Sequence, residues 1–130
     1  ALDEYGRNLG VAFQLVDDAL DYDSNAAAMG KDRGDDFREG KMTLPVILAY
    51  ARGDAEERKF WEAAIAGHRT SDEDLAHAVA LVERHDCVTA TRERAQHFAQ
   101  RAADALSIFP DGKAREAMVE AAQFAVARGH

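Results

Sequence analysis

Three aspartates, Asp17, Asp18 and Asp21, lie within five positions of an otherwise apolar segment, FQLVDDALDY. Aspartate has a low helix propensity and carboxylates at these spacings repel one another, so another interaction must offset their cost in a helix. In a helix Asp17 and Asp21 share one face, and Asp18 points to the side. Gly10 and Gln14 continue the same stripe, and the glycine leaves room beside the carboxylates. Oxygen ligands so arranged suit Mg²⁺, which usually binds one or two carboxylates together with substrate phosphates.

Two other interpretations of these aspartates have to be weighed. The first is that they mark a solvated helix face and bind nothing. The second is an EF-hand calcium loop, whose first, third, fifth and twelfth positions would be Asp21, Asp23, Asn25 and Asp32. The EF-hand match fails, because Ala26 stands where the tight turn needs glycine and an aspartate stands where a bidentate glutamate is usual.

Two lysines, Lys31 and Lys41, follow in a glycine-containing segment, SNAAAMGKDRGDDFREGKMT, where the helical periodicity fails. An ammonium group beside a carboxylate-bound metal would neutralise the charge of a diphosphate. The lysines could equally form solvated ion pairs with their acidic neighbours, which are Asp32, Asp35, Asp36 and Glu39. Spacing alone leaves both interpretations open. We expect residues 24–43 to form a structured loop that covers a site.

The elements that would position these side chains are all helices. Residues 1–22 carry apolar side chains at spacings of three, four and seven, which is typical of an amphipathic helix. Because no capping residue precedes Ala1, we expect a chain cut from a longer protein. Further helices are predicted at 44–50, from Asp54 to near Gly67, from Ser71 to near Asp86, from Val88 to Ile108, and from Lys113 to Arg128. The fold class is therefore all-α.

Core positions follow from the same periodicity. Phe60 and Trp61 are expected in the core, with a role in an interface as the second interpretation. The last helix is expected to bury one stripe, formed by Ala117, Met118, Ala121, Phe124 and Ala125.

Composition narrows the class of protein further. With 130 residues and 47% hydrophobic content, the chain suffices for one compact domain. A formal net charge of −8 argues against nucleic acid as a partner, since duplex binding rests on clustered lysine and arginine. Neither a secretory signal nor an apolar run long enough to cross a bilayer is seen. A single cysteine, Cys87, cannot form an internal disulfide, and a cytoplasmic location is expected.

The two segments GVAFQLVDDALDY and GKDRGDDFREGKMTLPVI resemble the second aspartate-rich region of the trans-isoprenyl (polyprenyl) diphosphate synthases. The likeness covers the whole chain and is most specific in residues 10–45. It implies an antiparallel helical bundle that forms the carboxyl-terminal part of the isoprenoid synthase fold. Residues 1–130 would be a single helical domain, and a fragment of a larger one whose upstream half, with the first DDxxD motif, is missing.

The resemblance implies a role for each residue of the motif and its surroundings. Asp17 would be the principal ligand of a magnesium ion, and Asp18 and Asp21 would complete the metal motif directly or through water. The remaining roles concern substrate: Phe13 would line the isoprenoid channel, Gln14 would reach the allylic diphosphate, and Lys31 and Lys41 would contact the diphosphate. The catalytic set is then Asp17, Asp18, Asp21 and Lys31.

The implied reaction adds isopentenyl diphosphate to an allylic isoprenyl diphosphate, with Mg²⁺ stabilising the departing diphosphate. A long-chain polyprenyl product and a homodimer are expected, and the fragment alone is predicted to be inactive. The alternative is a non-catalytic regulatory subunit or helical interaction module that retains the motif through ancestry. A piece of a terpene cyclase would use the same ionisation chemistry, but the segment EGKMTLP disfavours it.

Overall fold

A computed structural model describes residues 1–23 and 34–127, and all the regular structure within those ranges is helical. The chain forms two compact units. The first consists of residues 1–17 and 92–130, and the second of residues 18–91. The all-α class is confirmed. The prediction that residues 1–130 form one domain of a longer protein stays a prediction.

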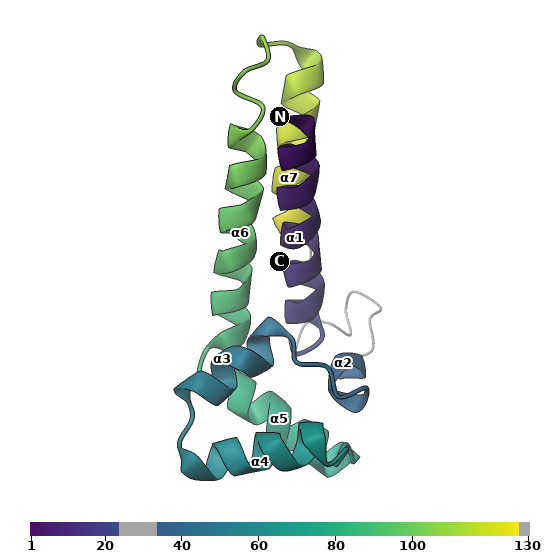
Figure 1. Ribbon diagram of the computed structural model, residues 1–130, viewed down its shortest axis with the longest axis vertical. Helices are drawn as coiled ribbons and strands as arrows, with labels where there is room; N and C mark the ends of the chain where they lie inside the picture. The colour runs from purple at the N-terminus through teal and green to yellow at the C-terminus, as the bar shows by residue number, and fades with distance from the viewer. Residues whose placement is uncertain (24–33, 128–130) are drawn as a thin grey trace. The chain divides into compact units, whose positions relative to one another are not determined.

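The first unit is built from α1 (Leu2–Leu20), α6 (Cys87–Asp104) and α7 (Lys113–Ala127), as Figure 1 shows. Its core is formed mostly by small side chains, which let helices approach closely; its buried members are Tyr5, Ala12, Ala99, Ala102, Leu106 and Ala122. Tyr5 of α1 donates a hydrogen bond of 2.8 Å to the backbone carbonyl of Met118 in α7. The buried hydroxyl therefore has its partner, as a tyrosine in a core requires.

The second unit contains α2 (Asp35–Arg38), α3 (Leu44–Arg52), α4 (Ala55–Ala66) and α5 (Asp72–Arg84) (Figure 1). Trp61 of α4 is at the centre of its core, 1% exposed. The rings of Phe37 and Phe60 stand edge-on to its indole, with centroids 6.4 Å and 5.2 Å away. The prediction that Trp61 is a core residue is confirmed.

Two of the predicted helix starts are confirmed by their caps. Asp54 and Glu57 form a capping box: the Glu57 amide donates to Oδ1 of Asp54 at 2.9 Å, and the Asp54 amide donates to Oε2 of Glu57 at 2.8 Å. The hydroxyl of Ser71 accepts from the Asp74 amide at 3.1 Å. Side chains of this kind satisfy the orphan amides of a first turn.

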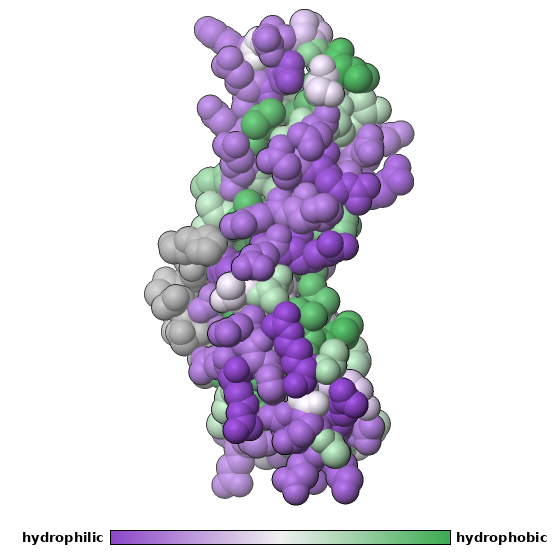
Figure 2. Space-filling view, turned by 90° about the vertical axis from the view of Figure 1, so that its left-hand side faces the viewer, coloured by the Kyte–Doolittle hydropathy of each residue, from purple (hydrophilic) through white to green (hydrophobic). Residues whose placement is uncertain are grey.

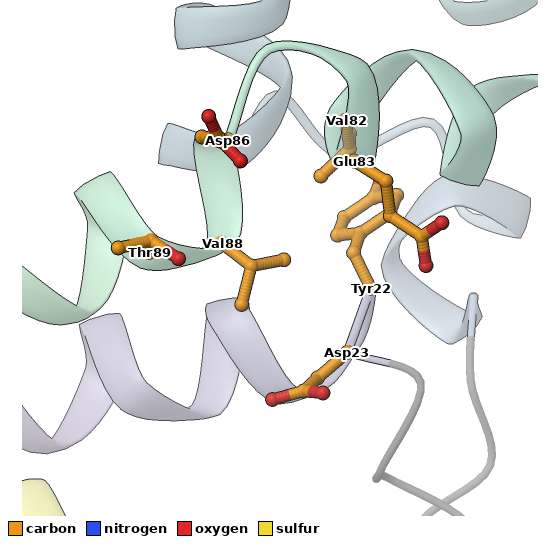
Figure 3. A pocket seen from close by; sticks show the side chains of 7 residues that line it. All are labelled: Tyr22, Asp23, Val82, Glu83, Asp86, Val88 and Thr89. Atoms are coloured by element: carbon orange, nitrogen blue, oxygen red, sulfur yellow. The ribbon is translucent and has the colours of Figure 1, made fainter.

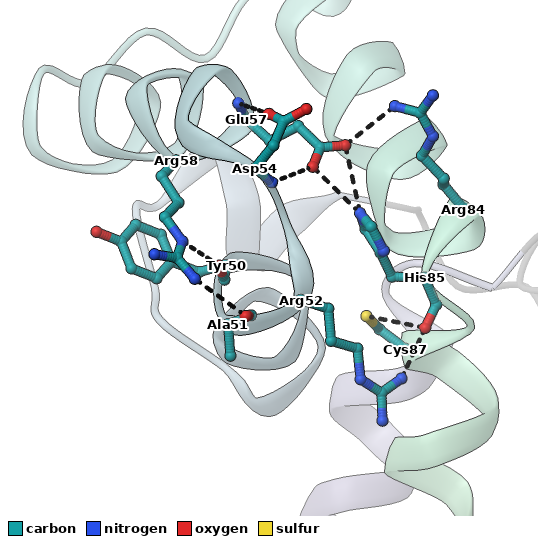
Figure 4. Close-up of polar contacts among 9 residues, drawn as sticks. All are labelled: Tyr50, Ala51, Arg52, Asp54, Glu57, Arg58, Arg84, His85 and Cys87. Atoms are coloured by element: carbon teal, nitrogen blue, oxygen red, sulfur yellow. Dashed lines mark hydrogen bonds and ion pairs between the residues drawn. The ribbon is translucent and has the colours of Figure 1, made fainter.

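Polar side chains join the ends of α3, α4 and α5 (Figure 4). Arg58 of α4 donates to the carbonyls of Tyr50 at 3.0 Å and Ala51 at 3.1 Å, so it satisfies acceptors that the end of α3 leaves open. Arg52 of α3 donates to the carbonyl of His85, just after α5, at 2.6 Å. The three helices are thus tied at their ends as well as through their core.

Glu57 is the buried centre of this network (Figure 4). Besides the Asp54 amide, its carboxylate accepts from Nη1 of Arg84 at 3.1 Å, and Nε2 of His85 lies 3.3 Å away. The bond from the Asp54 amide does most to lower the pKa of Glu57 below its ordinary value; burial opposes this, and His85 and Arg84 add to the lowering. The network therefore favours the ionised carboxylate.

Glu57→Gln is expected to remove a pH-dependent part of the stability. Because the pKa of the folded state is lowered, this stabilisation is fully present above the unfolded pKa of about 4.3 and is lost as the pH falls through the folded value. The urea midpoint of the wild-type chain should fall more steeply below about pH 4.5 than that of the variant. Glu56→Gln, at an exposed neighbour in the same turn, is the matched control. Equal slopes for wild type and Glu57→Gln would contradict the prediction.

The structure corrects the prediction of a loop over residues 24–43. Residues 35–38 form α2, a single helical turn that the helical periodicity did not reveal. Phe37 in this turn is fully buried against the core of the second unit. A four-residue helix cannot be stable by itself, so contacts with distant residues must hold it. Residues 24–33 lie outside the described ranges.

Gly34, the N-cap of α2, has a φ of +90°. A Cβ added there would lie 2.5 Å from a methyl carbon of Leu75. Gly34→Ala is therefore expected to lower the free energy of unfolding by about 1–2 kcal/mol, the cost of a left-handed alanine. Gly10→Ala, in the middle of α1 with nothing within 4 Å, should instead raise it by about 0.5–1 kcal/mol. Urea unfolding of both variants measures the two opposite changes in the free energy of unfolding. A Gly34→Ala variant as stable as wild type would contradict the prediction for Gly34.

Two predictions about the last helices are wrong in part. The helix expected from Val88 to Ile108 ends at Asp104, and the chain continues in tight turns, with the Leu106 amide bonded to the carbonyl of Ala103 at 3.1 Å. In α7 the buried residues are Ala122 and Ala125, of which Ala125 belongs to the predicted core stripe and Ala122 does not. Phe124, which was expected in the core stripe, is 76% exposed.

Hydrophilic residues cover most of the face seen in Figure 2. Large apolar side chains are nevertheless exposed at several described positions: Leu2, Val11, Phe13, Met42, Ile47, Ile108 and Phe124. Within the described ranges, no helix combines the length and apolar character that crossing a membrane requires.

Candidate functional site

The aspartate cluster lies at the carboxyl-terminal end of α1. Asp17 and Asp18 are in the last turn, Asp21 follows Leu20, and no basic residue occupies that turn. The helix dipole places partial negative charge at this end, so carboxylates here are unfavourable for the helix. Such a cluster needs hydrogen-bond donors or a cation to offset its charge.

The three carboxylates differ in burial. Asp17 is half-buried, Asp18 is 8% exposed and Asp21 is 0% exposed. All three have polar or electrostatic partners in the structure. Asp17 is therefore the most exposed of the three carboxylates, and the metal-binding roles of all three stay predictions.

Asp21 makes two contacts with α2 that the sequence analysis did not foresee. Its side-chain Oδ2 accepts a hydrogen bond of 3.0 Å from the Asp36 amide. Its backbone carbonyl accepts one of 2.9 Å from the Gly34 amide. The only hint in the sequence is the short acidic run GDDF, residues 34–37. Helical spacing cannot predict a contact between residues fifteen positions apart.

The electrostatics beside Asp21 are strongly negative. Tyr22 is fully buried, and burial raises the pKa of its hydroxyl well above the ordinary value. The charges of Asp21, Asp36 and Asp18 raise this pKa further, in that order. Their carboxylates therefore act on one buried region of the second unit, where a cation or a hydrogen-bond donor would be stabilised.

Lys41 lies three residues after α2 and is largely exposed. Its Nζ is 3.0 Å from Oε2 of Glu39 and 3.8 Å from Oδ1 of Asp36. The hydrogen bond to Glu39 is the main reason that the pKa of Lys41 is raised, and Asp36 contributes. The ion pairs that the sequence analysis left open are thus formed for Lys41, and its ammonium group stays accessible and charged.

The other substrate-binding candidates were Phe13, Gln14 and Lys31. Phe13 and Gln14 are exposed on α1, with Phe13 47% exposed, so both can be reached by a ligand. Lys31 lies outside the described residues. The roles of all three stay predictions.

The donor set fits a metal only in part. Within residues 1–23 and 34–127, no three or more His, Cys, Asp or Glu side chains are grouped so as to hold a metal ion. The half-buried carboxylate of Asp17 is of the oxygen type that Mg²⁺ prefers, together with water and phosphate oxygens. Asp21 is buried and its Oδ2 accepts from the Asp36 amide, and its role as a metal ligand stays a prediction.

A cavity of about 350 Å³ lies beside Tyr22 and Asp23 (Figure 3). Its lining residues are Tyr22, Asp23, Val82, Glu83, Asp86, Val88 and Thr89. Asp86, with a φ of +54°, makes the sharp turn between α5 and α6. Three carboxylates around the opening would repel an anionic ligand, so this cavity is not suited to a diphosphate.

Comparison with known proteins assigns the fold. The chain is similar to the polyprenyl synthase of Caulobacter crescentus CB15, solved with calcium and isoprenyl diphosphate, with a TM-score of 0.89 and 46% identity over 98% of this chain and 39% of that one. A decaprenyl diphosphate synthase from Rhodobacter capsulatus matches with a TM-score of 0.89 and 44% identity, over 98% of this chain and 39% of that one. The helices are thus those of the isoprenoid synthase fold.

The sequence identifies the family. The polyprenyl synthetase family matches residues 1–82. The octaprenyl diphosphate synthase of Haemophilus influenzae is 40% identical over 100% of this chain and 39% of its own length. The chain therefore belongs to the polyprenyl synthetase family and spans about two fifths of the length of these relatives.

Proposed function

We propose that the full-length protein is a Mg²⁺-dependent trans-prenyltransferase that adds isopentenyl diphosphate to an allylic isoprenyl diphosphate. The observation that carries this proposal is the aspartate cluster at the negative end of α1, without a basic residue in the same turn. Relatives that are named octaprenyl and decaprenyl diphosphate synthases support a long-chain product. A related enzyme solved with calcium and isoprenyl diphosphate supports a divalent cation and a diphosphate as ligands.

In this proposal Asp17 holds the metal ion, and Asp18 adds negative charge beside it. Mg²⁺, when bound, stabilises the negative charge that grows on the departing diphosphate. Lys41, with its charged and accessible ammonium group, donates hydrogen bonds to the same diphosphate. Gln14 and Lys31 bind the allylic diphosphate, and Phe13 contacts the isoprenyl chain. Because negative charge develops on the departing diphosphate, these groups stabilise the transition state more than the bound substrate.

The proposal extends to the part of the enzyme that this chain represents. It is the carboxyl-terminal part with the second aspartate-rich motif, and a first DDxxD motif elsewhere in the full-length protein completes the metal site. Because that first motif would supply the other metal ligands, we expect the isolated chain to be inactive. A cytoplasmic homodimer is proposed on the resemblance alone.

The test is a prenyl-transfer assay on the full-length protein with isopentenyl diphosphate and allylic diphosphates of increasing length. Condensation that stops when Mg²⁺ is chelated, together with an inactive isolated chain, would support the proposal. Absence of transfer by a folded full-length protein with every allylic substrate would reject it. A helical regulatory or interaction module would then be the better assignment.

A further inference from the structure

The short helix α2 has no cap of its own. Its N-cap residue is Gly34, which has no side chain to accept a hydrogen bond. Helix starts leave their first amides unsatisfied, and a single turn gains too little from its own backbone to persist. The stabilising acceptor must therefore come from another part of the chain.

Asp21 supplies that acceptor from the end of α1. Its Oδ2 accepts from the Asp36 amide at 3.0 Å, and its carbonyl accepts from the Gly34 amide at 2.9 Å. The charge of the carboxylate also favours the positive end of α2. Because Asp21 is fully buried, water cannot easily replace either bond.

The far side of α2 is anchored by Phe37. Its ring is fully buried and lies edge-on to Trp61, with centroids 6.4 Å apart. The turn is thus attached at two points, by hydrogen bonds to Asp21 and by the aromatic core.

Lys41 is tied to the same turn through its backbone. Its amide donates to the carbonyl of Asp36 at 2.9 Å, and the preceding amide of Gly40, at a φ of +74°, donates to the carbonyl of Phe37 at 3.0 Å. Asp36 therefore links the two residues, because its amide donates to Asp21 and its carbonyl accepts from the Lys41 amide.

We propose that Asp21 is a positioning residue, whose carboxylate caps α2 across fifteen positions and so fixes the backbone that carries Lys41. Asp21 would then act through this hydrogen bond, whereas the resemblance implies that it completes the metal motif directly or through water. The effect on diphosphate binding rests on the proposed function, whereas the capping role does not.

Two substitutions separate the roles of Asp21. Asparagine keeps an oxygen that can accept from the Asp36 amide but removes the charge a metal needs, whereas alanine removes both. Hydrogen exchange followed by mass spectrometry on the full-length protein should show amides 34–41 exchanging about tenfold faster in Asp21→Ala. Asp21→Asn should stay within about threefold of wild type.

Binding of Mg²⁺ with inorganic pyrophosphate to the same proteins, measured by calorimetry, tests the link to Lys41. Asp21→Ala should weaken the affinity by about tenfold, and Asp21→Asn by no more than about threefold. The Lys41→Ala substitution should reduce the affinity less in the Asp21→Ala protein than in wild type, because the effects of coupled residues are not additive.

Each result decides the inference. Unchanged exchange of amides 34–41 in Asp21→Ala would overturn the capping role, whether or not the protein binds pyrophosphate. An Asp21→Asn protein with normal exchange but with binding as weak as that of Asp17→Asn would make Asp21 a ligand. If wild type binds no pyrophosphate with Mg²⁺, the proposed function fails, and the exchange measurement alone confirms or overturns the cap.

Discussion

Asp17→Asn is expected to slow prenyl transfer by the full-length protein by about 100-fold or more, the usual loss when one group that stabilises developing charge is removed. Asparagine has nearly the shape of aspartate but lacks the charge that binds Mg²⁺. Asp17 is the most accessible of the three aspartates of the motif, so the loss should be greater than for Asp21→Asn. Steady-state rates at saturating Mg²⁺ and both diphosphates measure it.

Asp3→Asn is the matched control for Asp17→Asn. Asp3 is an exposed carboxylate in the first turn of the same helix. Its substitution therefore removes one negative charge from α1, as Asp17→Asn does. We expect this variant to keep its activity within about twofold. Equal rates for Asp17→Asn and wild type would mean that the aspartates form a solvated face, as in the alternative interpretation of the sequence. A drop in the urea midpoint of Asp17→Asn that matches its loss of activity would assign Asp17 to stability.

Trp61→Ala is expected to lower the free energy of unfolding by about 3–5 kcal/mol, the range for an aromatic residue cut to alanine in a core. Trp61 is 1% exposed and stands in edge-on contact with Phe37 and Phe60. Its loss would open a cavity and remove the contact that anchors α2. Urea unfolding, followed by circular dichroism at 222 nm as a helix signal, gives this change as a shift in midpoint.

Phe124→Ala is the control for the tryptophan. Because the ring of Phe124 is 76% exposed, its removal should change the stability by less than about 0.5 kcal/mol. A Trp61→Ala variant that unfolds together with wild type would contradict the assignment of Trp61 to the core. A large loss for Phe124→Ala would show that Phe124 packs in the core, as the sequence predicted.

The sequence predicted the main elements well because their signals are local. Apolar spacing identified α1, and the caps at Asp54 and Ser71 identified the starts of α4 and α5. The same spacing failed for α7, where alanine occupies several faces and leaves the direction of the core ambiguous. The prediction of a buried Ala125 is confirmed, but Phe124 is exposed and Ala122, which was not predicted, is buried.

By itself, the sequence determined the all-helical class, the family and the presence of a carboxylate cluster, since residue types and short spacings carry that information. The tertiary structure alone decided how exposed each aspartate is and which groups it contacts. Asp17 is half-buried at the end of α1, whereas Asp21 is buried with its carboxylate bonded to the Asp36 amide. The physical reason is that α2 is stabilised by contacts between residues far apart in the chain, which the helical period does not encode.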